Sequence, residues 1–279
     1  MHISQNNMKY IYIVVLSIIF NITSQAQTAK FDWEKASKWV NTNVVGVQNP
    51  HYAFPTEEGF TVYSIEEIGT RVYAPQIIYI SKFDNTGKYQ SSVEIPLPKR
   101  QLKDATLLKI IEGEGKLYVF SYVALKKDKK NVLYAQVYDN TTETISDTYE
   151  LYTLPIAKVN NSGFFDVELS QDLKKFAVLV NQPYVKKTKE TIDVLILDAN
   201  LELISSVKQE LSFDSKRSSR EELFVENDET VTLIKKTNIN KKSPITTVIT
   251  ITGETLKEQQ VSADKFYISD SKVIAVSGK

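Results

Sequence analysis

The strongest constraint in this sequence is a pattern of short strands that returns four times at a nearly constant spacing. In each copy, an apolar core rich in β-branched and aromatic residues precedes a second apolar run that ends in a polar turn. The cores start 57, 59 and 55 residues apart, at Phe60, Leu117, Phe176 and Val231. The polar turns lie 55, 59 and 54 residues apart, at Asp84, Asp139, Asp198 and Thr252. Two independent anchors with one period predict a repeat architecture.

The clearest copy runs from Gly163 to Phe213 and contains four apolar runs joined by short polar segments, with no helical segment between them. The run Ile192 to Leu197 is apolar at almost every position, as expected of a strand that is covered on both faces. The run Leu201 to Leu211 alternates, which is typical of an outer strand half in water. Each copy is therefore predicted to be a four-stranded antiparallel sheet, and the fold class is all-β.

A repeat of this length that forms one four-stranded antiparallel sheet is typical of a propeller blade. From about Thr56 onward the chain resembles the β-propeller superfamily with TolB-type or WD-like repeats, without a close family match. The segment Ser170 to Val180 (SQDLKKFAVLV), followed by VLILDANLEL, is similar to the inner half of a TolB-type blade. Leu173 departs from the pattern, because the Ser-x-Asp-Gly turn of those repeats has glycine there. The resemblance implies a propeller architecture and carries over no functional residue.

The repeats predict a single β-propeller domain over residues 44–279. Its units are expected at about 44–97, 102–154, 163–213 and 221–261, with a partial fifth at 265–279. Closing a propeller ring normally requires the last sheet to be completed from the other terminus. Two arrangements remain open: Val44 to Phe54 supplies the missing strands of the fifth sheet, or the blades form an open arc.

Residues 1–26 are predicted to be a signal peptide. An apolar run, Tyr10 to Phe20, follows Met8-Lys9, and the small residues of Ser24-Gln25-Ala26 suit a cleavage site. The run is too short for a stable transmembrane helix, so no stable membrane span is expected after cleavage; an uncleaved anchor is the alternative. Translation starts at Met1 or Met8. Export places the protein in the periplasm, at the outer membrane or outside the cell.

Residues 27–43 are expected to form an N-terminal segment with a short helix that contains both tryptophans, Trp33 and Trp39. The spacing of their apolar neighbours is helical, but the window is short. We interpret this helix as a cap over one end of the sheets, since open edges need covering. The alternative is a binding element.

Catalytic constellations are missing from the sequence. Cysteine is absent, which excludes disulfides, thiolate metal sites and a cysteine nucleophile. Once the signal is removed, His51 is the only histidine, which is too few for a histidine zinc site. A Ser-His-Asp triad would have to use His51, and no strand-turn-helix elbow or glycine-flanked serine accompanies it. Neighbouring carboxylates such as Glu57 and Glu58 point to opposite faces of a strand and cannot flank a glycosidic bond. We therefore predict no catalytic residue, no metal ligand and no cofactor, which favours a non-enzymatic protein.

Charge, although balanced overall with 34 basic and 34 acidic residues, separates when the loops are sorted by position. In such a sheet the second turn and the crossing to the next sheet lie at one end, and the first and third turns lie at the other. The first of these ends is expected to carry 19 basic and five acidic residues, and the opposite end 16 acidic and five basic residues. The predicted binding residues at the basic end are Arg100, Lys127, Lys129, Lys130, Lys186, Lys187, Lys189, Arg217, Lys241 and Lys242.

These patterns lead to the hypothesis of an exported, non-enzymatic propeller that binds or scaffolds at a bacterial envelope. Its basic end would attract an acidic protein, a polysaccharide or a lipopolysaccharide through the summed field of its cations. Nucleic acid is not expected, because few aromatic residues accompany the cations. The alternatives are a hydrolase or lyase that acts on glycans, a structural protein whose partner docks on the flank of an open arc, and lysine-rich turns that serve solubility alone.

Overall fold

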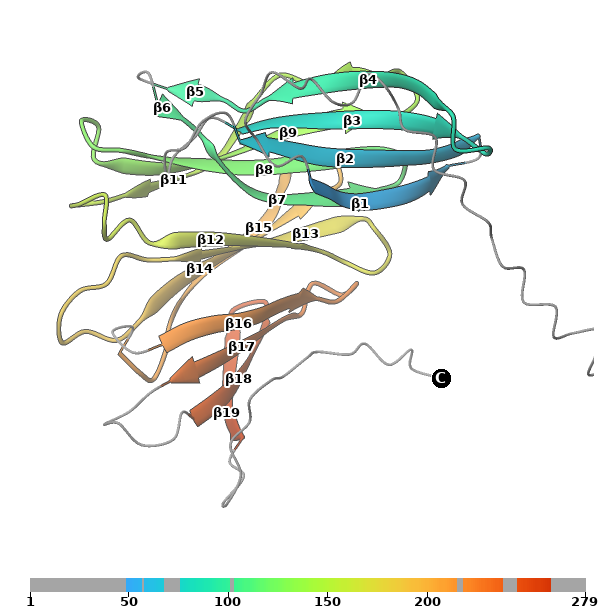
Figure 1. The fold of residues 1–279 in the computed structure, drawn as a ribbon. Helices are drawn as coiled ribbons and strands as arrows, with labels where there is room; N and C mark the ends of the chain where they lie inside the picture. Colours follow the sequence, from blue (N-terminus) through green and yellow to red (C-terminus); the bar gives the residue numbers. More distant parts are fainter. Residues whose placement is uncertain are drawn as a thin grey trace, which may run out of the picture.

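The computed structural model of the chain describes residues 49–56, 58–67, 76–100, 103–214, 218–237 and 245–261. The predicted signal peptide, the short helix with the tryptophans and the partial fifth unit lie outside these ranges. The described residues form strands and turns (Figure 1), and none of them belongs to a helix that could cross a membrane. The predicted all-β class is confirmed.

The strands form four antiparallel sheets, which we number as blades one to four in chain order. Blade one contains β1 (Asn49–Thr56), β2 (Gly59–Glu67), β3 (Gln76–Asp84) and β4 (Tyr89–Pro96). Blade two contains β7 (Thr106–Gly113), β8 (Lys116–Leu125) and β9 (Lys130–Asp139), and its outer strand is split into β10 (Thr144–Ile145) and β11 (Tyr149–Pro155). A small hairpin, β5 (Lys99–Arg100) and β6 (Lys103–Asp104), lies in the crossover between blades one and two.

The other two blades repeat the same up-and-down order. Blade three contains β12 (Phe164–Leu169), β13 (Lys175–Asn181), β14 (Thr191–Asp198) and β15 (Leu203–Glu210). Blade four contains β16 (Ser218–Val225), β17 (Val231–Thr237), β18 (Ile245–Thr252) and β19 (Thr255–Val261). In β14 every residue from Ile192 to Leu197 is buried, which confirms the prediction of a strand covered on both faces.

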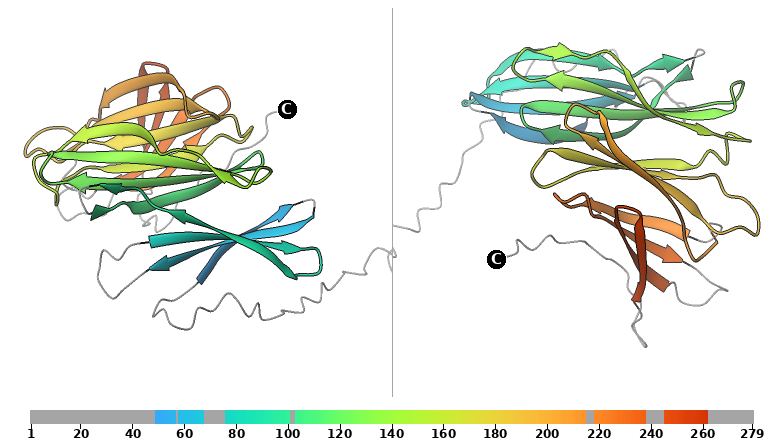
Figure 2. Two further views of the ribbon diagram at one scale, coloured as in Figure 1. Left: turned by 90° about the horizontal axis from the view of Figure 1, so that it is seen from above. Right: turned by 180° about the vertical axis from the view of Figure 1, so that it is seen from behind.

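Successive blades pack face to face, with one apolar cluster at each interface. The cluster between blades one and two includes Ile78, Ile80 and Val119. The cluster between blades two and three includes Phe120 and Phe176, and the cluster between blades three and four includes Leu179 and Leu233. The first strands β7, β12 and β16 approach one another, so the sheets fan out from a shared axis (Figure 2). This is the arrangement of propeller blades, and the predicted fold is confirmed.

The four described blades form an arc that runs from blade one at one end to blade four at the other (Figure 1). The suggestion that Val44 to Phe54 completes a fifth sheet is wrong for the described part of that segment. Residues Asn49–Thr56 form β1, the first strand of blade one, with Phe54 opposite Thr61 of β2. This strand therefore pairs with β2 of blade one.

The recurring aspartates are explained by turn geometry. Asp84 Oδ1 accepts hydrogen bonds from the backbone N–H groups of Thr86 (2.9 Å) and Lys88 (3.0 Å), and Asp139 Oδ1 does the same for Thr141 and Thr142. The hydroxyl of Thr86 contributes most to lowering the pKa of Asp84 below its usual value. These aspartates fix the third turns of blades one and two, which is a structural role.

Lysines bridge the blades near the first and third turns. Lys82 of blade one pairs with Glu143 of blade two (2.8 Å), and Lys109 of blade two pairs with Glu168 of blade three. Each interface between consecutive blades is thus crossed by a lysine from the earlier blade and a glutamate from the later one.

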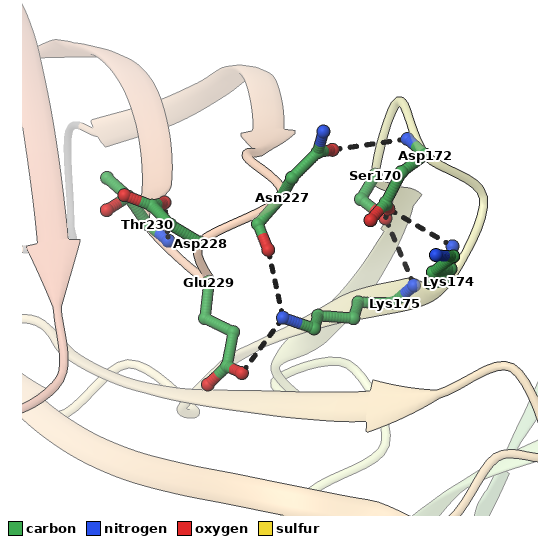
Figure 3. A network of polar contacts seen from close by, with 8 residues as sticks. All are labelled: Ser170, Asp172, Lys174, Lys175, Asn227, Asp228, Glu229 and Thr230. Carbon is green, nitrogen blue, oxygen red and sulfur yellow. Dashed lines mark hydrogen bonds and ion pairs between the residues drawn. The ribbon is translucent and has the colours of Figure 1, made fainter.

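The same bridge between blades three and four is part of a larger polar network (Figure 3). Lys175 Nζ lies 3.1 Å from Glu229 Oε1 and donates to the carbonyl of Asn227 (2.9 Å). The backbone N–H of Asp172 donates to Asn227 Oδ1 (3.1 Å). Lys175 is therefore tied to blade four.

The interface between blades two and three is expected to dominate stability. Phe176 is fully buried, and its ring meets Tyr118 and Phe120 edge-on at centroid distances of 4.6 Å and 5.5 Å. Phe176→Ala should lower the free energy of unfolding by about 3–5 kcal/mol, because it leaves a cavity in a close-packed core. Urea unfolding measures the change. Leu203→Ala, at a 59% exposed position of β15, is the control and should stay within about 0.5 kcal/mol of wild type. Equal effects would contradict the assigned core.

Candidate basic binding face

A basic surface forms where the second turns of blades two and three meet the crossover between them. We call it the basic loop face and define it as residues 126–130, 156–163 and 182–190. Its eight lysines are Lys126, Lys127, Lys129, Lys130, Lys158, Lys186, Lys187 and Lys189, and its acidic residues are Asp128 and Glu190. Figure 1 shows these loops at one end of the sheets, opposite the end that carries the first and third turns.

Hydrogen bonds join the three segments into one surface. The backbone N–H of Ile156 donates to the carbonyl of Lys129 (2.9 Å), which ties the crossover to the turn of blade two. Asn161 then holds the loop of blade three: its Nδ2 donates to the carbonyl of Tyr184 and its Oδ1 accepts from the N–H of the same residue, both at 2.9 Å. Asn131 Nδ2 also donates to the carbonyl of Ser162 (3.2 Å).

Glycine is required where the crossover enters blade three. Gly163 has a φ of 67°, in the left-handed region. A Cβ at this position would lie 2.3 Å from the carbonyl oxygen of Asn181 and 2.6 Å from Leu154 Cδ2. The close approach fixes the course of the crossover and hence the position of Lys158.

A pocket of about 360 Å³ opens between the turn of blade two and the crossover. Its lining residues are Lys126, Lys129, Ile156, Ala157, Lys158, Val159 and Asn160. Three of the seven are lysines, so the pocket can hold negative charge. The side chain of Ile156 is buried, whereas Val159 is exposed and adds apolar surface.

Most lysines of the basic loop face are available to a ligand. Lys189 pairs with Glu210 (3.2 Å). For the other seven, the described residues place no carboxylate within 4.0 Å of the ammonium nitrogen. The contrast with Lys82, Lys109 and Lys175, which are all paired across blade interfaces, is clear. Among the described residues, Lys88, Lys116 and Lys174 at the end with the first and third turns also have no carboxylate within 4.0 Å, so lysines of this kind are more numerous on the basic loop face but not confined to it.

Six of the ten predicted binding residues lie on this face: Lys127, Lys129, Lys130, Lys186, Lys187 and Lys189. Arg100 is exposed on β5, where its guanidinium carbon lies 5.5 Å from the ring centroid of Tyr134 and its Nε donates to the tyrosine hydroxyl (3.4 Å). Arg217, Lys241 and Lys242 lie outside the described residues.

The pocket residues Lys126 and Lys158 belong to the predicted basic end but not to the predicted binding set. Asn161 was not singled out either. The signal that points to the pocket is the contact between two loops, and sequence spacing alone does not reveal it. Glycine at position 163 is the nearest local sign of a tight crossover.

Lys235 and Lys236 are among the 19 basic residues that the loop sorting assigns to the basic end, but both lie in strand β17. Lys235 is fully buried between blades three and four, where its ammonium contacts the Glu190 carboxylate and lies 5.9 Å from the ring centroid of Phe164. Asn181 Nδ2 donates to the same carboxylate. Burial lowers the pKa of Lys235 to about 7, while contact with Glu190 acts in the opposite direction.

A second polar cluster, made of Tyr152, Gln182 and Asp193, lies between blades two and three. The hydroxyl of Tyr152 donates to Asp193 Oδ2 (2.6 Å), and Gln182 Nε2 donates to the same oxygen. Burial, together with this hydrogen bond, raises the pKa of Tyr152 to about 12. Both groups anchor the ends of the 182–190 loop, so they position the lysines between them.

The described residues contain no cluster of three or more His, Cys, Asp or Glu side chains that could hold a metal ion.

No family model matches the chain, and no curated protein matches its sequence. Solved structures of similar shape include the β-propeller domain of the Trilobed protease from Pyrococcus furiosus, described as having an open velcro topology (12% identity, 77% of this chain, 58% of that chain, TM-score 0.42). Another is an endo-arabinase from Bacteroides thetaiotaomicron, with 13% identity over 77% of this chain and 75% of that chain and a TM-score of 0.36. A third is a eukaryotic initiation factor, with 12% identity over 72% of this chain and 52% of that chain and a TM-score of 0.29. At these identities and TM-scores, the likenesses carry no functional argument.

Removal of one partner from the buried ion pair should be far more harmful than removal of both. Lys235→Met removes the ammonium that contacts the buried Glu190 carboxylate and should cost about 3–5 kcal/mol in urea unfolding. The Lys235→Met/Glu190→Gln double variant should recover most of this loss, since a neutral amide still accepts the hydrogen bond from Asn181. Additive losses in the double variant would show that the two groups do not interact.

Proposed function

We propose that this protein is an exported, non-enzymatic β-propeller module that binds an anionic partner at a bacterial envelope through the basic loop face. One observation carries the proposal: seven lysines without a carboxylate partner among the described residues lie on loops that hydrogen bonds join into one surface. Such a surface attracts polyanions from a distance through its summed field.

The partner is expected to carry many negative charges at flexible spacing. Lysine acts as a point charge on a mobile stem and does not impose the planar, bidentate geometry of arginine. A charged polysaccharide, the charged sugars of a lipopolysaccharide or an acidic protein segment would satisfy these lysines. Hydrolysis or elimination of a glycan is the alternative activity, but no observation on this face favours it.

Retention on a heparin column at neutral pH provides the test. Wild type should be retained and should elute as salt rises, because each lysine contact releases counterions from the polyanion. The triple variant Lys127→Glu/Lys186→Glu/Lys187→Glu should elute at much lower salt, and its binding should depend less steeply on salt concentration.

A charge-matched variant controls for net charge. Lys88, Lys174 and Lys257 are exposed and lie outside the basic loop face, so their triple replacement by Glu should leave retention close to that of wild type. If both triple variants lose retention equally, net charge and not this face governs binding. If wild type is not retained at all, the proposed function fails.

A further inference from the structure

The pocket between the turn of blade two and the crossover differs chemically from the rest of the basic loop face. Lys126 and Lys129 come from the turn, and Lys158 comes from the crossover on the other side. The hydrogen bond from Ile156 to Lys129 holds the two sides together (2.9 Å), and Asn161 fixes the far end of the crossover. Lysines from both sides therefore line one open pocket, whereas Lys127 and Lys130 do not line it.

The charge of the pocket suits a compact, multiply charged anion. None of its three lysines has a carboxylate within 4.0 Å among the described residues, so an anionic ligand would meet no competing carboxylate there. A singly charged group would leave this excess largely unbalanced. A phosphoryl monoester carries a charge of about −1.5 to −2 at neutral pH and has three strong acceptor oxygens.

The number of lysines also favours a phosphoryl group over a carboxylate, which carries a single charge. The lining contains lysines and Asn160 but no arginine, and lysine binds phosphate as a point charge. Ammonium groups on mobile stems can adapt to a tetrahedral anion, whose oxygens point in different directions.

The remaining walls indicate that the phosphoryl group is attached to an organic body. Ile156, Ala157 and Val159 supply apolar surface beside the lysines. A volume of about 360 Å³ is small for a ligand pocket, but it exceeds what one phosphate ion needs. A phosphorylated monosaccharide, free or at the end of a glycan, has the required combination of size, charge and carbon surface.

We propose that this pocket is a binding site for a sugar phosphate, with Lys126, Lys129 and Lys158 holding the phosphoryl group and Ile156 and Val159 packing against the sugar. The inference rests on the proposed function, because the pocket would be the specific subsite of a face that otherwise holds anions by charge alone.

Isothermal titration calorimetry on the full-length protein tests the site with glucose 6-phosphate, glucose 6-sulfate, glucose and inorganic phosphate. Glucose 6-phosphate should bind at least tenfold more tightly than glucose or glucose 6-sulfate at pH 7.5. Its affinity should fall severalfold at pH 5.5, because the second ionisation of the phosphoryl group has a pKa of about 6. The sulfate ester keeps one charge throughout and controls for titration of the protein.

Inorganic phosphate tests whether the site recognises a sugar phosphate or only a free phosphate ion. It should bind more weakly than glucose 6-phosphate, since it leaves the apolar wall uncovered. Equal affinity of the two ligands would overturn the assignment of a sugar phosphate. Equal affinity of the sulfate and phosphate esters, without dependence on pH, would overturn the assignment of a phosphoryl group.

Matched variants locate the site. Lys126→Gln/Lys158→Gln should reduce the affinity for glucose 6-phosphate at least tenfold, whereas Lys127→Gln/Lys130→Gln removes the same charge beside the pocket and should change it less than threefold. Both pairs should retain the wild-type melting temperature, because Lys126, Lys127 and Lys158 are exposed and Lys130 is half-buried at a strand end. Equal losses in the two double variants would contradict the pocket assignment.

Failure of this inference is distinguishable from failure of the proposed function. The Lys126→Gln/Lys158→Gln variant keeps Lys127, Lys186 and Lys187 and should still be retained on heparin. If wild type binds heparin but no sugar phosphate, the pocket assignment falls and the basic loop face remains. If it binds neither, both fall.

Discussion

The structure depends on face-to-face packing of consecutive sheets. A four-stranded sheet that buries both faces cannot stand alone, so each blade needs a neighbour, and a near-constant repeat places equivalent strands against one another. Phe176 illustrates the dependence: it belongs to blade three, but its ring packs between Tyr118 and Phe120 of blade two. Because the blades stack in one direction, all equivalent turns emerge at the same end.

That arrangement places the lysine–glutamate pairs between blades and the basic loop face at opposite ends of the sheets. Near the first and third turns, lysines reach across blade interfaces to glutamates, as Lys175 does to Glu229. On the basic loop face the lysines lie on turns that extend past the sheets, and for all but Lys189 the described residues offer no carboxylate within ion-pairing distance. The chain has no net charge, yet the basic loop face carries a strong local positive charge.

Sequence periodicity was sufficient to predict the blades, because burial on both faces leaves a continuous apolar run and each turn has its own polar residues. Asp84 and Asp139 recur for this local reason. Contacts between blades were not predictable in the same way. Lys235 looks like a surface lysine in the sequence, yet it is buried against Glu190 because two blades meet there. The pocket around Lys126 and Lys158 likewise depends on a crossover folding back onto a turn.

The central claim is that blade stacking gathers the lysines of the basic loop face into one surface, where they engage an anion. Quantitative acetylation of each lysine, followed by mass spectrometry with and without heparin, tests this claim most directly. Heparin should slow the acetylation of Lys126, Lys127, Lys129, Lys158, Lys186 and Lys187 and leave Lys88, Lys174 and Lys257 unchanged. Protection spread evenly over both groups, or confined to the second group, would contradict the account.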